Sequence, residues 1–118
     1  MPSATFAPND LLVGDYPVAT RTVTYLAGAL YVRGAVLGEI TASKKVTTSL
    51  SAAGDGSEVP RLVAAYDVDA TGGDVVAQAY ASGGFDASKM TFGAGHTATT
   101  VEAAFRKDGA PLYVRTLA

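Results

Sequence analysis

Short runs of β-branched and aromatic residues, separated by glycine, dominate the chain and most strongly constrain its fold. In the clearest run, residues 20–27, Val23 and Tyr25 alternate with threonines, which is the pattern of a strand with one buried face. Further strand candidates of the same kind occupy residues 31–42, 45–51, 61–70 and 74–83. Several short strands joined by turn residues predict a small, mainly β domain.

One segment near the C-terminus has the pattern of a short helix. Within residues 97–109, Thr99 precedes Glu102 by the spacing of a capping box, and apolar residues recur every three to four positions. Glycine and then proline follow this segment, and both end helices. We expect the residues after the helix, 111–118, to form an edge strand.

Two glycines, Gly34 and Gly38, lie within the apolar stretch 30–41. A glycine-rich loop can bind phosphate when a helix and a Lys-Ser or Lys-Thr pair follow it, but here Ile40 and Thr41 favour a strand. We therefore predict that both glycines are structural. In a strand, such glycines mark a bulge, a bend or the close approach of another backbone.

The N-terminal residues differ from the rest of the chain. Residues 1–19 contain three of the five prolines, which disfavours a central strand. They also carry spaced apolar side chains, so we expect an extended arm that binds another molecule; the alternative is an arm that folds back on its own domain. The predicted organisation is an arm over residues 1–19 and a β-rich domain over residues 20–118. The candidate binding residues of the arm are Phe6, Leu11, Leu12, Val13 and Tyr16.

Composition narrows the function classes. Charged residues make up only 17% of the chain, the net charge is −2 and no basic cluster occurs, which disfavours a nucleic acid partner. Cysteine is absent, which excludes disulfides and thiolate metal sites, and no apolar run is long enough to span a bilayer. We expect no cofactor and no metal. A surface with so few charges is typical of proteins that self-associate or dock onto a partner.

Enzymatic chemistry has little support in the sequence. His96 is the single histidine, and as a base it would need a carboxylate such as Asp86, which no spacing rule brings close to it. No serine lies in a G-x-S-x-G motif, and the acidic residues within 67–74 lack the spacing of a calcium loop. We expect a protein without catalytic activity, and a small hydrolase that uses His96 with Asp86 is kept as an alternative.

Four stretches, taken together, point to a family. They read GDYPVATRTVTYLAG at 14–28, RGAVLGEITAS at 33–43, YDVDATGGDVVAQAYASGGFD at 66–86 and MTFGAGHTATTVEAAFRKDG at 90–109. In order and spacing they resemble the head decoration proteins of lambda-type tailed bacteriophages. The resemblance covers the chain from Gly14 onward, so the first part of the arm lies outside it.

The resemblance implies a viral capsid decoration, or cement, protein that is made in the cytoplasm of a bacterial host and lies on the outer surface of the virion. It implies homotrimers that bind the major capsid protein at three-fold and quasi-three-fold positions of the expanded head and stabilise the head against the pressure of packaged DNA. It implies no enzymatic activity, no cofactor, and no direct nucleic acid or membrane partner.

The resemblance also implies a bent β-ribbon of the β-clip type, with one short C-terminal helix and an N-terminal segment that becomes ordered on the capsid, where it can add to a capsid strand. An alternative is another homo-oligomeric phage module, of a tail or a fibre, with a similar β fold. The sparse charge calls for buried surface between copies. Candidates for the trimer interface are Tyr31, Phe85, Leu112 and Tyr113.

Overall fold

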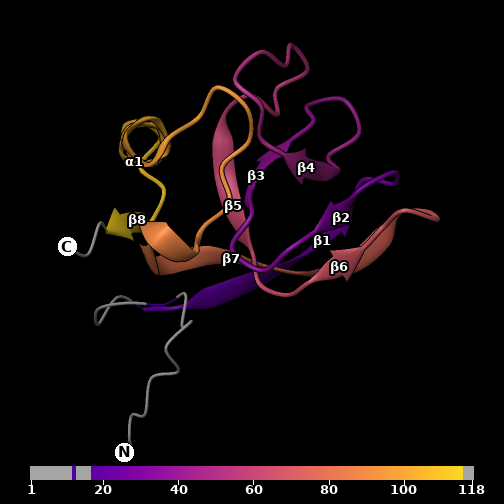
Figure 1. Cartoon of the computed structure of the whole chain (residues 1–118), viewed down its shortest axis with the longest axis horizontal. Helices are drawn as coiled ribbons and strands as arrows, with labels where there is room; N and C mark the ends of the chain where they lie inside the picture. Colours follow the sequence, from indigo (N-terminus) through magenta and orange to yellow (C-terminus); the bar gives the residue numbers. More distant parts are fainter. Residues whose placement is uncertain (1–11, 13–16, 116–118) are drawn as a thin grey trace, which may run out of the picture.

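The structure is a computed structural model that describes Leu12 and residues 17–115. The described chain is mainly β with one short α-helix near its C-terminal end, which confirms the predicted fold class. Along the chain the elements are β1 (Ala19–Tyr25), β2 (Leu30–Tyr31), β3 (Val36–Glu39), β4 (Val46–Thr48), β5 (Pro60–Ala64), β6 (Val68–Asp69), β7 (Val75–Asp86), the 3₁₀ helix η1 (Ala87–Lys89), α1 (Ala98–Lys107) and β8 (Leu112–Arg115) (Figure 1).

Six of these strands form one sheet that closes on itself like a small barrel. The strand order is β1-β4-β3-β5-β7-β8, and β1 also pairs with β7, so five strands make a ring and β8 extends it at an edge. The length of β7 allows this arrangement, because its first part pairs antiparallel with β1 and its last part pairs parallel with β8. The sequence predicted β8 as an edge strand, but it did not predict the closure.

Two of the predicted strands are each divided in the structure. Residues 31–42 separate into β2 and β3 at a turn where Gly34 adopts a φ of 94°, and residues 61–70 separate into β5 and β6. The physical reason is that β2 and β6 leave the main sheet and pair with each other. We call this pair the β2–β6 ribbon. The predicted strand 74–83 continues past Gly83 as far as Asp86.

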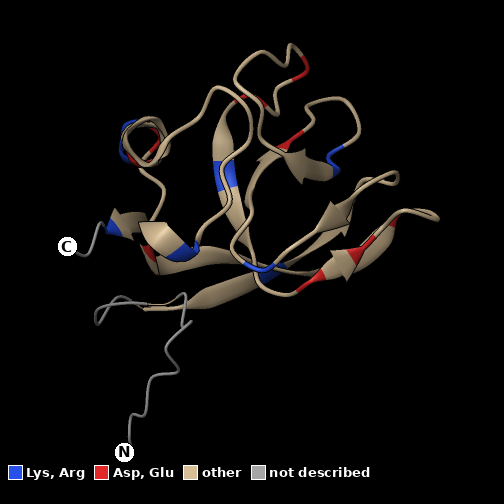
Figure 2. Cartoon of the chain, in the orientation of Figure 1, with Lys and Arg blue, Asp and Glu red and all other residues tan. Residues whose placement is uncertain are grey.

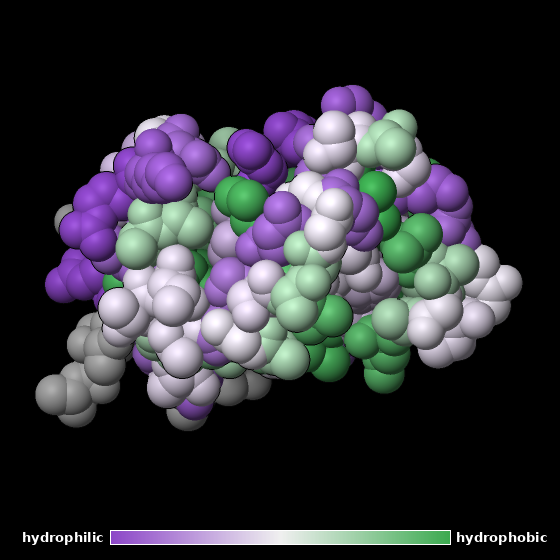
Figure 3. Space-filling model, turned by 90° about the horizontal axis from the view of Figure 1, so that it is seen from above, coloured by the Kyte–Doolittle hydropathy of each residue, from purple (hydrophilic) through white to green (hydrophobic). Residues whose placement is uncertain are grey.

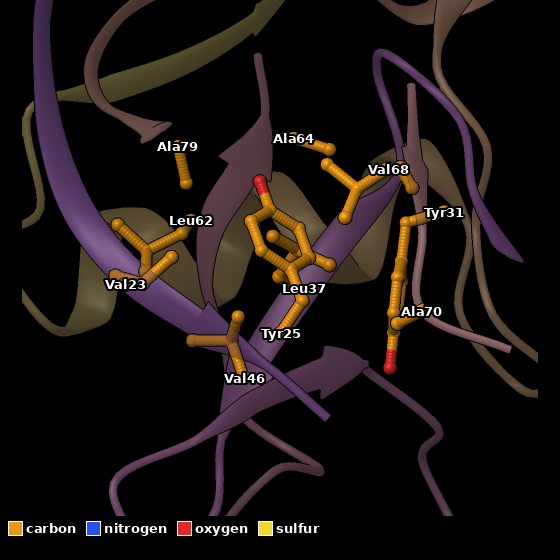
Figure 4. Close-up of a cluster of buried hydrophobic side chains, with 11 residues drawn as sticks. Val23, Tyr25, Tyr31, Leu37, Val46, Leu62, Ala64, Val68, Ala70 and Ala79 are labelled. Atoms are coloured by element: carbon orange, nitrogen blue, oxygen red, sulfur yellow. The ribbon is translucent and has the colours of Figure 1, made fainter. Parts of the chain in front are cut away.

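The central strands β3 and β5 are buried on both faces, because neighbouring residues along each strand belong to two different hydrophobic cores. One core, here called the helix-side core, lies beneath α1 and contains Val36, Val63, Ala65, Tyr80, Phe85, Met90, Val101, Phe105, Leu112 and Val114. The other, the ribbon-side core, contains Val23, Tyr25, Tyr31, Ala35, Leu37, Val46, Leu62, Ala64, Val68, Ala70 and Ala79 (Figure 4).

Helix α1 lies where the sequence predicted it, but its cap is different. The capping residue is Thr97, whose hydroxyl accepts a hydrogen bond from the Thr100 backbone N–H, while the Thr100 hydroxyl accepts one from the Thr97 N–H. The predicted Thr99–Glu102 box is therefore wrong by two residues. Glu102 pairs instead with Arg106, one turn later, at 2.7 Å. The predicted apolar face is present, since Val101 is fully buried in the helix-side core.

Candidate interaction surface

The base of the N-terminal arm lies against the arm's own domain. Among the predicted arm residues, Leu12 is described by the structure, and Phe6, Leu11, Val13 and Tyr16 lie outside the described residues. Leu12 forms an isolated antiparallel bridge with Phe85 of β7 and packs, half-buried, against the helix-side core. At Leu12, therefore, the arm folds back on its own domain, which was the alternative prediction from the sequence.

Three of the four residues predicted for the trimer interface are core residues instead. Tyr31 is 1% exposed, Phe85 is fully buried and Leu112 is nearly so, because each packs inside one of the two cores. Their side chains therefore have no surface to offer to another copy. Tyr113 is different, because it lies on the outer face of β8 and is 40% exposed. Of the four predicted residues, Tyr113 therefore remains the candidate for a contact between copies.

Exposed hydrophobic side chains concentrate near the β2–β6 ribbon. Of the large hydrophobic residues that are exposed in the described chain, four lie on or beside this ribbon: Leu30, Val32, Tyr66 and Val76. The others are Val18, Leu50 and Tyr113. Figure 3 shows hydrophobic surface mainly in the half of the molecule that carries the ribbon, and hydrophilic surface around α1. Sequence reasoning missed Leu30 and Val32, although their alternation with buried Tyr31 was a readable signal.

The acidic residues of the ribbon hold turns together. Asp67 accepts a hydrogen bond from the Arg33 backbone N–H at 2.8 Å. Asp69 accepts from the Thr71 hydroxyl at 2.6 Å, and this hydrogen bond lowers the pKa of Asp69 below its usual value. In Figure 2 the acidic positions colour the chain red at and beside β6. Among the residues described by the structure, no cluster of His, Cys, Asp or Glu is arranged to hold a metal ion.

Asp74, at the start of β7, joins two other segments of the chain. Its carboxylate accepts a hydrogen bond from the Ala27 backbone N–H at 2.8 Å and pairs with the Lys45 ammonium at 2.6 Å. The hydrogen bond from Lys45 lowers the pKa of Asp74 below its usual value, and the bond from Ala27 adds to this effect. The carboxylate thus connects the end of β1, the start of β4 and β7 at the ribbon end of the molecule.

His96 connects loops, and within the part of the chain that the structure describes it has no acid partner. Its Nε2 lies 3.0 Å from the Glu58 carbonyl oxygen and 3.3 Å from the Ser49 hydroxyl, and its Nδ1 lies 3.2 Å from the Thr100 hydroxyl. The carbonyl oxygen can only accept, so Nε2 carries a proton and cannot act as a base toward Ser49. Asp86 instead caps η1 by accepting from the Ser88 backbone N–H. The two residues of the hydrolase alternative therefore have separate partners.

One pocket of the described chain is a groove lined by both polar and apolar surface. It has a volume of about 270 Å³ and lies between β1, β3, β5 and the turn from α1 to β8. Arg21, Glu39, Arg61 and Asp108 line it, so its charges are mixed, and Arg21 and Glu39 approach each other to 4.0 Å. Within the described residues, no helix is long and apolar enough to cross a membrane.

The two glycines singled out from the sequence occupy different environments. Gly34 lies in the turn between β2 and β3, and its left-handed φ of 94° favours glycine. Gly38 lies inside β3, where the pairing with β5 shifts register. A Cβ at Gly38 would overlap the backbone carbonyl of Ser57. One glycine thus permits a turn, and the other permits the close approach of a neighbouring backbone.

A comparison with family models adds an independent finding to this geometry. The model described as bacteriophage lambda head decoration protein D matches residues 2–110. The match includes the predicted arm, and it spans every strand and helix described above except β8. No curated protein matches the chain.

Proposed function

The chain belongs to the bacteriophage lambda head decoration protein D family, and we propose that it binds as a homotrimer to the outside of the expanded phage head. Membership of the family makes it a phage capsid decoration protein and a component of the virion, and this is not a known enzyme family. The proposal adds the trimer, the three-fold and quasi-three-fold positions on the head, and the stabilisation of the shell against packaged DNA. The match over residues 2–110 is the observation that carries it.

The arm is the proposed contact with the major capsid protein. Its sequence carries spaced apolar residues such as Phe6 and Leu11, which suit a strand that adds to the edge of a capsid sheet. Ordering such a segment costs roughly 1–2 kcal/mol per residue for the backbone, so a single arm binds weakly. A trimer presents three arms at once, and the raised effective concentration multiplies their affinities.

Decoration stabilises the head by mass action. A protein that binds the expanded shell more tightly than the unexpanded one shifts the equilibrium toward the expanded state by the difference between the two binding free energies. In this proposal the binding site is complete only where capsid subunits meet in the expanded arrangement. The decoration protein therefore needs no chemistry of its own.

Contacts between copies need exposed surface, and we select two of the places where the described chain exposes hydrophobic side chains. Tyr113 lies exposed on the edge strand β8, and Leu30, at 60%, is among the most exposed of the hydrophobic side chains near the β2–β6 ribbon. Charged residues are depleted in the centres of protein interfaces, which fits the hydrophobic half of the surface in Figure 3. We place the trimer contacts among these residues.

Sedimentation with phage particles tests the proposal directly. The protein is incubated with expanded heads, unexpanded heads or isolated tails, and each mixture is spun through a density gradient. We expect saturable binding to expanded heads alone, with a number of bound copies divisible by three. Binding to tails would favour the alternative of a tail or fibre module, and equal binding to both kinds of head would contradict stabilisation by preferential binding.

A deletion separates the arm from the domain. Removal of residues 2–11 takes away the upstream part of the arm but keeps Leu12, which packs on the helix-side core. We expect this variant to fold, to form trimers by analytical ultracentrifugation and to lose its binding to expanded heads. A variant that still saturates heads with wild-type affinity would show that the arm is not the capsid contact.

A further inference from the structure

The base of the arm is tied to β7 at three successive points. Ala19 pairs with Ser82 at the end of the β1–β7 ladder. The Ser82 hydroxyl then donates a hydrogen bond of 3.0 Å to the Pro17 carbonyl oxygen. Further along β7, Leu12 bridges Phe85 in the antiparallel sense. These contacts lie on β7 at and beyond the residue that pairs with the start of β1.

At the last of these points the leucine side chain lies beside Gly83. Gly83 is buried with a φ of 138°, and a Cβ placed on it would lie 3.5 Å from Val18 Cγ2 and 3.6 Å from Leu12 Cδ2. These are ordinary van der Waals distances, so the site beside Gly83 is bordered by Val18 and by the fully buried ring of Phe85. Leu12 fills this site and extends the helix-side core. We call it the Leu12 site.

Leu12 does not reach Phe85 by simple continuation of the ladder. In an antiparallel ladder that continued from Ala19↔Ser82, three steps along β7 to Phe85 would match three steps back along the chain, to residue 16. Residue 12 holds that place instead, four positions further upstream. The contact therefore selects a particular leucine rather than the next residue in register.

We propose that Leu12 is the fixed point from which the capsid-binding arm leaves the domain, and that it positions the arm without itself contacting the capsid. This inference rests on the function proposed above. It moves the functional boundary of the arm from residue 19 to residue 11, and it removes Leu12 from the predicted capsid contacts. The Leu12 site takes one occupant, an aliphatic side chain of the same polypeptide.

A fixed point at Leu12 sets the reach of the arm. The eleven residues upstream of it span at most about 40 Å when fully extended, whereas the eighteen residues upstream of Ala19 would span at most about 65 Å. A shorter tether that matches the distance to its site gives a higher effective concentration at that site. Tying down Leu12 also leaves fewer residues to be ordered when the arm binds.

Two insertions of identical composition test the proposal. One variant carries Gly-Ser between Leu11 and Leu12, and the other carries Gly-Ser between Leu12 and Val13. If Leu12 is the fixed point, only the first insertion displaces the arm relative to the domain, because the second enlarges a segment that is closed at both ends, at small entropic cost. We expect the first to weaken binding to expanded heads by about tenfold, the loss of roughly one apolar contact, and the second to leave it unchanged.

The results of the two insertions distinguish a failure of the Leu12 inference from a failure of the proposed role of the arm. Equal losses from both insertions, or a loss from the second alone, would overturn Leu12 as the fixed point and leave the arm as the capsid contact. No loss from either insertion would overturn the role of the arm and the inference with it.

A measurement on the free protein adds a test that needs no heads. Leu12→Ala should lower the midpoint of thermal unfolding by about 4 °C, because it removes apolar packing from the helix-side core. The Gly-Ser insertion before Leu12 should leave that midpoint at the wild-type value. A Leu12→Ala variant with an unchanged midpoint would show that the Leu12 site is empty in solution, and this would overturn the proposal.

Discussion

The two cores of the domain share the strands β3 and β5 but differ in what completes them. The ribbon-side core is covered by the β2–β6 ribbon, and the rings of Tyr25 and Tyr31 meet there with centroids 5.2 Å apart. The helix-side core is covered by α1 and β8, and Leu12 is added to it from the arm. The ribbon-side core is therefore closed by strands of the domain alone, while the helix-side core also holds the base of the segment proposed to bind the capsid.

Gly38→Val should disrupt β3, one of the two strands that both cores share. A valine side chain there would collide with the Ser57 backbone, so we expect a loss of unfolding free energy on the order of 3 kcal/mol or more. Thermal unfolding followed by circular dichroism measures it. Gly72→Val is the matched control, since nothing lies within 4 Å of a Cβ at Gly72. A Gly38→Val protein that folds like wild type and loses only head affinity would instead place this stretch in the binding surface.

The ribbon-side core should respond to alkaline pH through Tyr25. Burial raises the pKa of Tyr25 from 10.0 to about 12, and its hydroxyl donates a 2.9 Å hydrogen bond to the Gln78 carbonyl oxygen. Below pH 10 both folded and unfolded chains keep the neutral phenol, so the stabilisation is complete. As the pH rises from 10 to 12 the unfolded chain ionises first, and stability falls by up to about 3 kcal/mol.

Urea unfolding of the wild type and of Tyr25→Phe between pH 9 and 12 checks this expectation. The Phe variant should be less stable at neutral pH, because it loses the hydrogen bond, but its stability should fall less steeply with rising pH. Tyr66→Phe, at an exposed position, serves as the control and should behave like wild type. Equal slopes for wild type and Tyr25→Phe would show that Tyr25 does not titrate with unfolding.

A pair of valines separates the roles of the two cores. Val101 is fully buried in the helix-side core and Val68 nearly so in the ribbon-side core. Replacing either by alanine should lower the unfolding free energy by about 2 kcal/mol. Head binding by the folded protein should weaken for Val101→Ala, which loosens the core beneath Phe85, and should be unchanged for Val68→Ala. If both variants bind heads alike, the arm is independent of the helix-side core.

Several elements of the fold could be predicted from local patterns in the sequence. The alternation around Val23 and Tyr25 predicts β1, and the spacing of apolar residues before Gly109 predicts α1, because both depend on neighbouring residues. The closure of the sheet depends on the pairing of β1 with β7, about fifty residues later, and no local pattern encodes it. The split of residues 61–70 was missed for the same reason, since β6 is defined by its partner β2.

The candidate site was harder to predict than the fold. Large aromatic residues such as Tyr31 and Phe85 suit an interface and a core equally well, and only the structure shows that they are buried in cores. The Leu12 site lies beside Gly83, which looks in the sequence like the end of a strand. A glycine can end a strand, or it can lie inside one at a positive φ, as Gly83 does at 138°, and sequence alone does not separate these uses.

The smallest effect is expected from the surface ion pairs at the two ends of the molecule. Asp74 pairs with Lys45 at the ribbon end, whereas Glu102 pairs with Arg106 within α1. Because hydrogen bonding lowers the pKa of Asp74 below 3.8, its contribution to stability is present above pH 3.8 and is lost as the pH falls through the lower folded value. Asp74→Asn should therefore reduce the unfolding midpoint slightly near pH 7 and hardly at all in strong acid.

Two further measurements extend the test of Asp74→Asn: one varies the salt concentration, and the other compares this variant with Glu102→Gln. High salt should shrink the effect of Asp74→Asn by screening its attraction to Lys45, but part should remain, because the Ala27 N–H also bonds to the carboxylate and an amide oxygen replaces it imperfectly. Glu102→Gln is the counterpart at the other end and should cost less, since its pair joins residues of one helix turn and connects no separate segments. A larger loss for Glu102→Gln would mean that the ribbon end is held by its apolar contacts rather than by the carboxylate of Asp74.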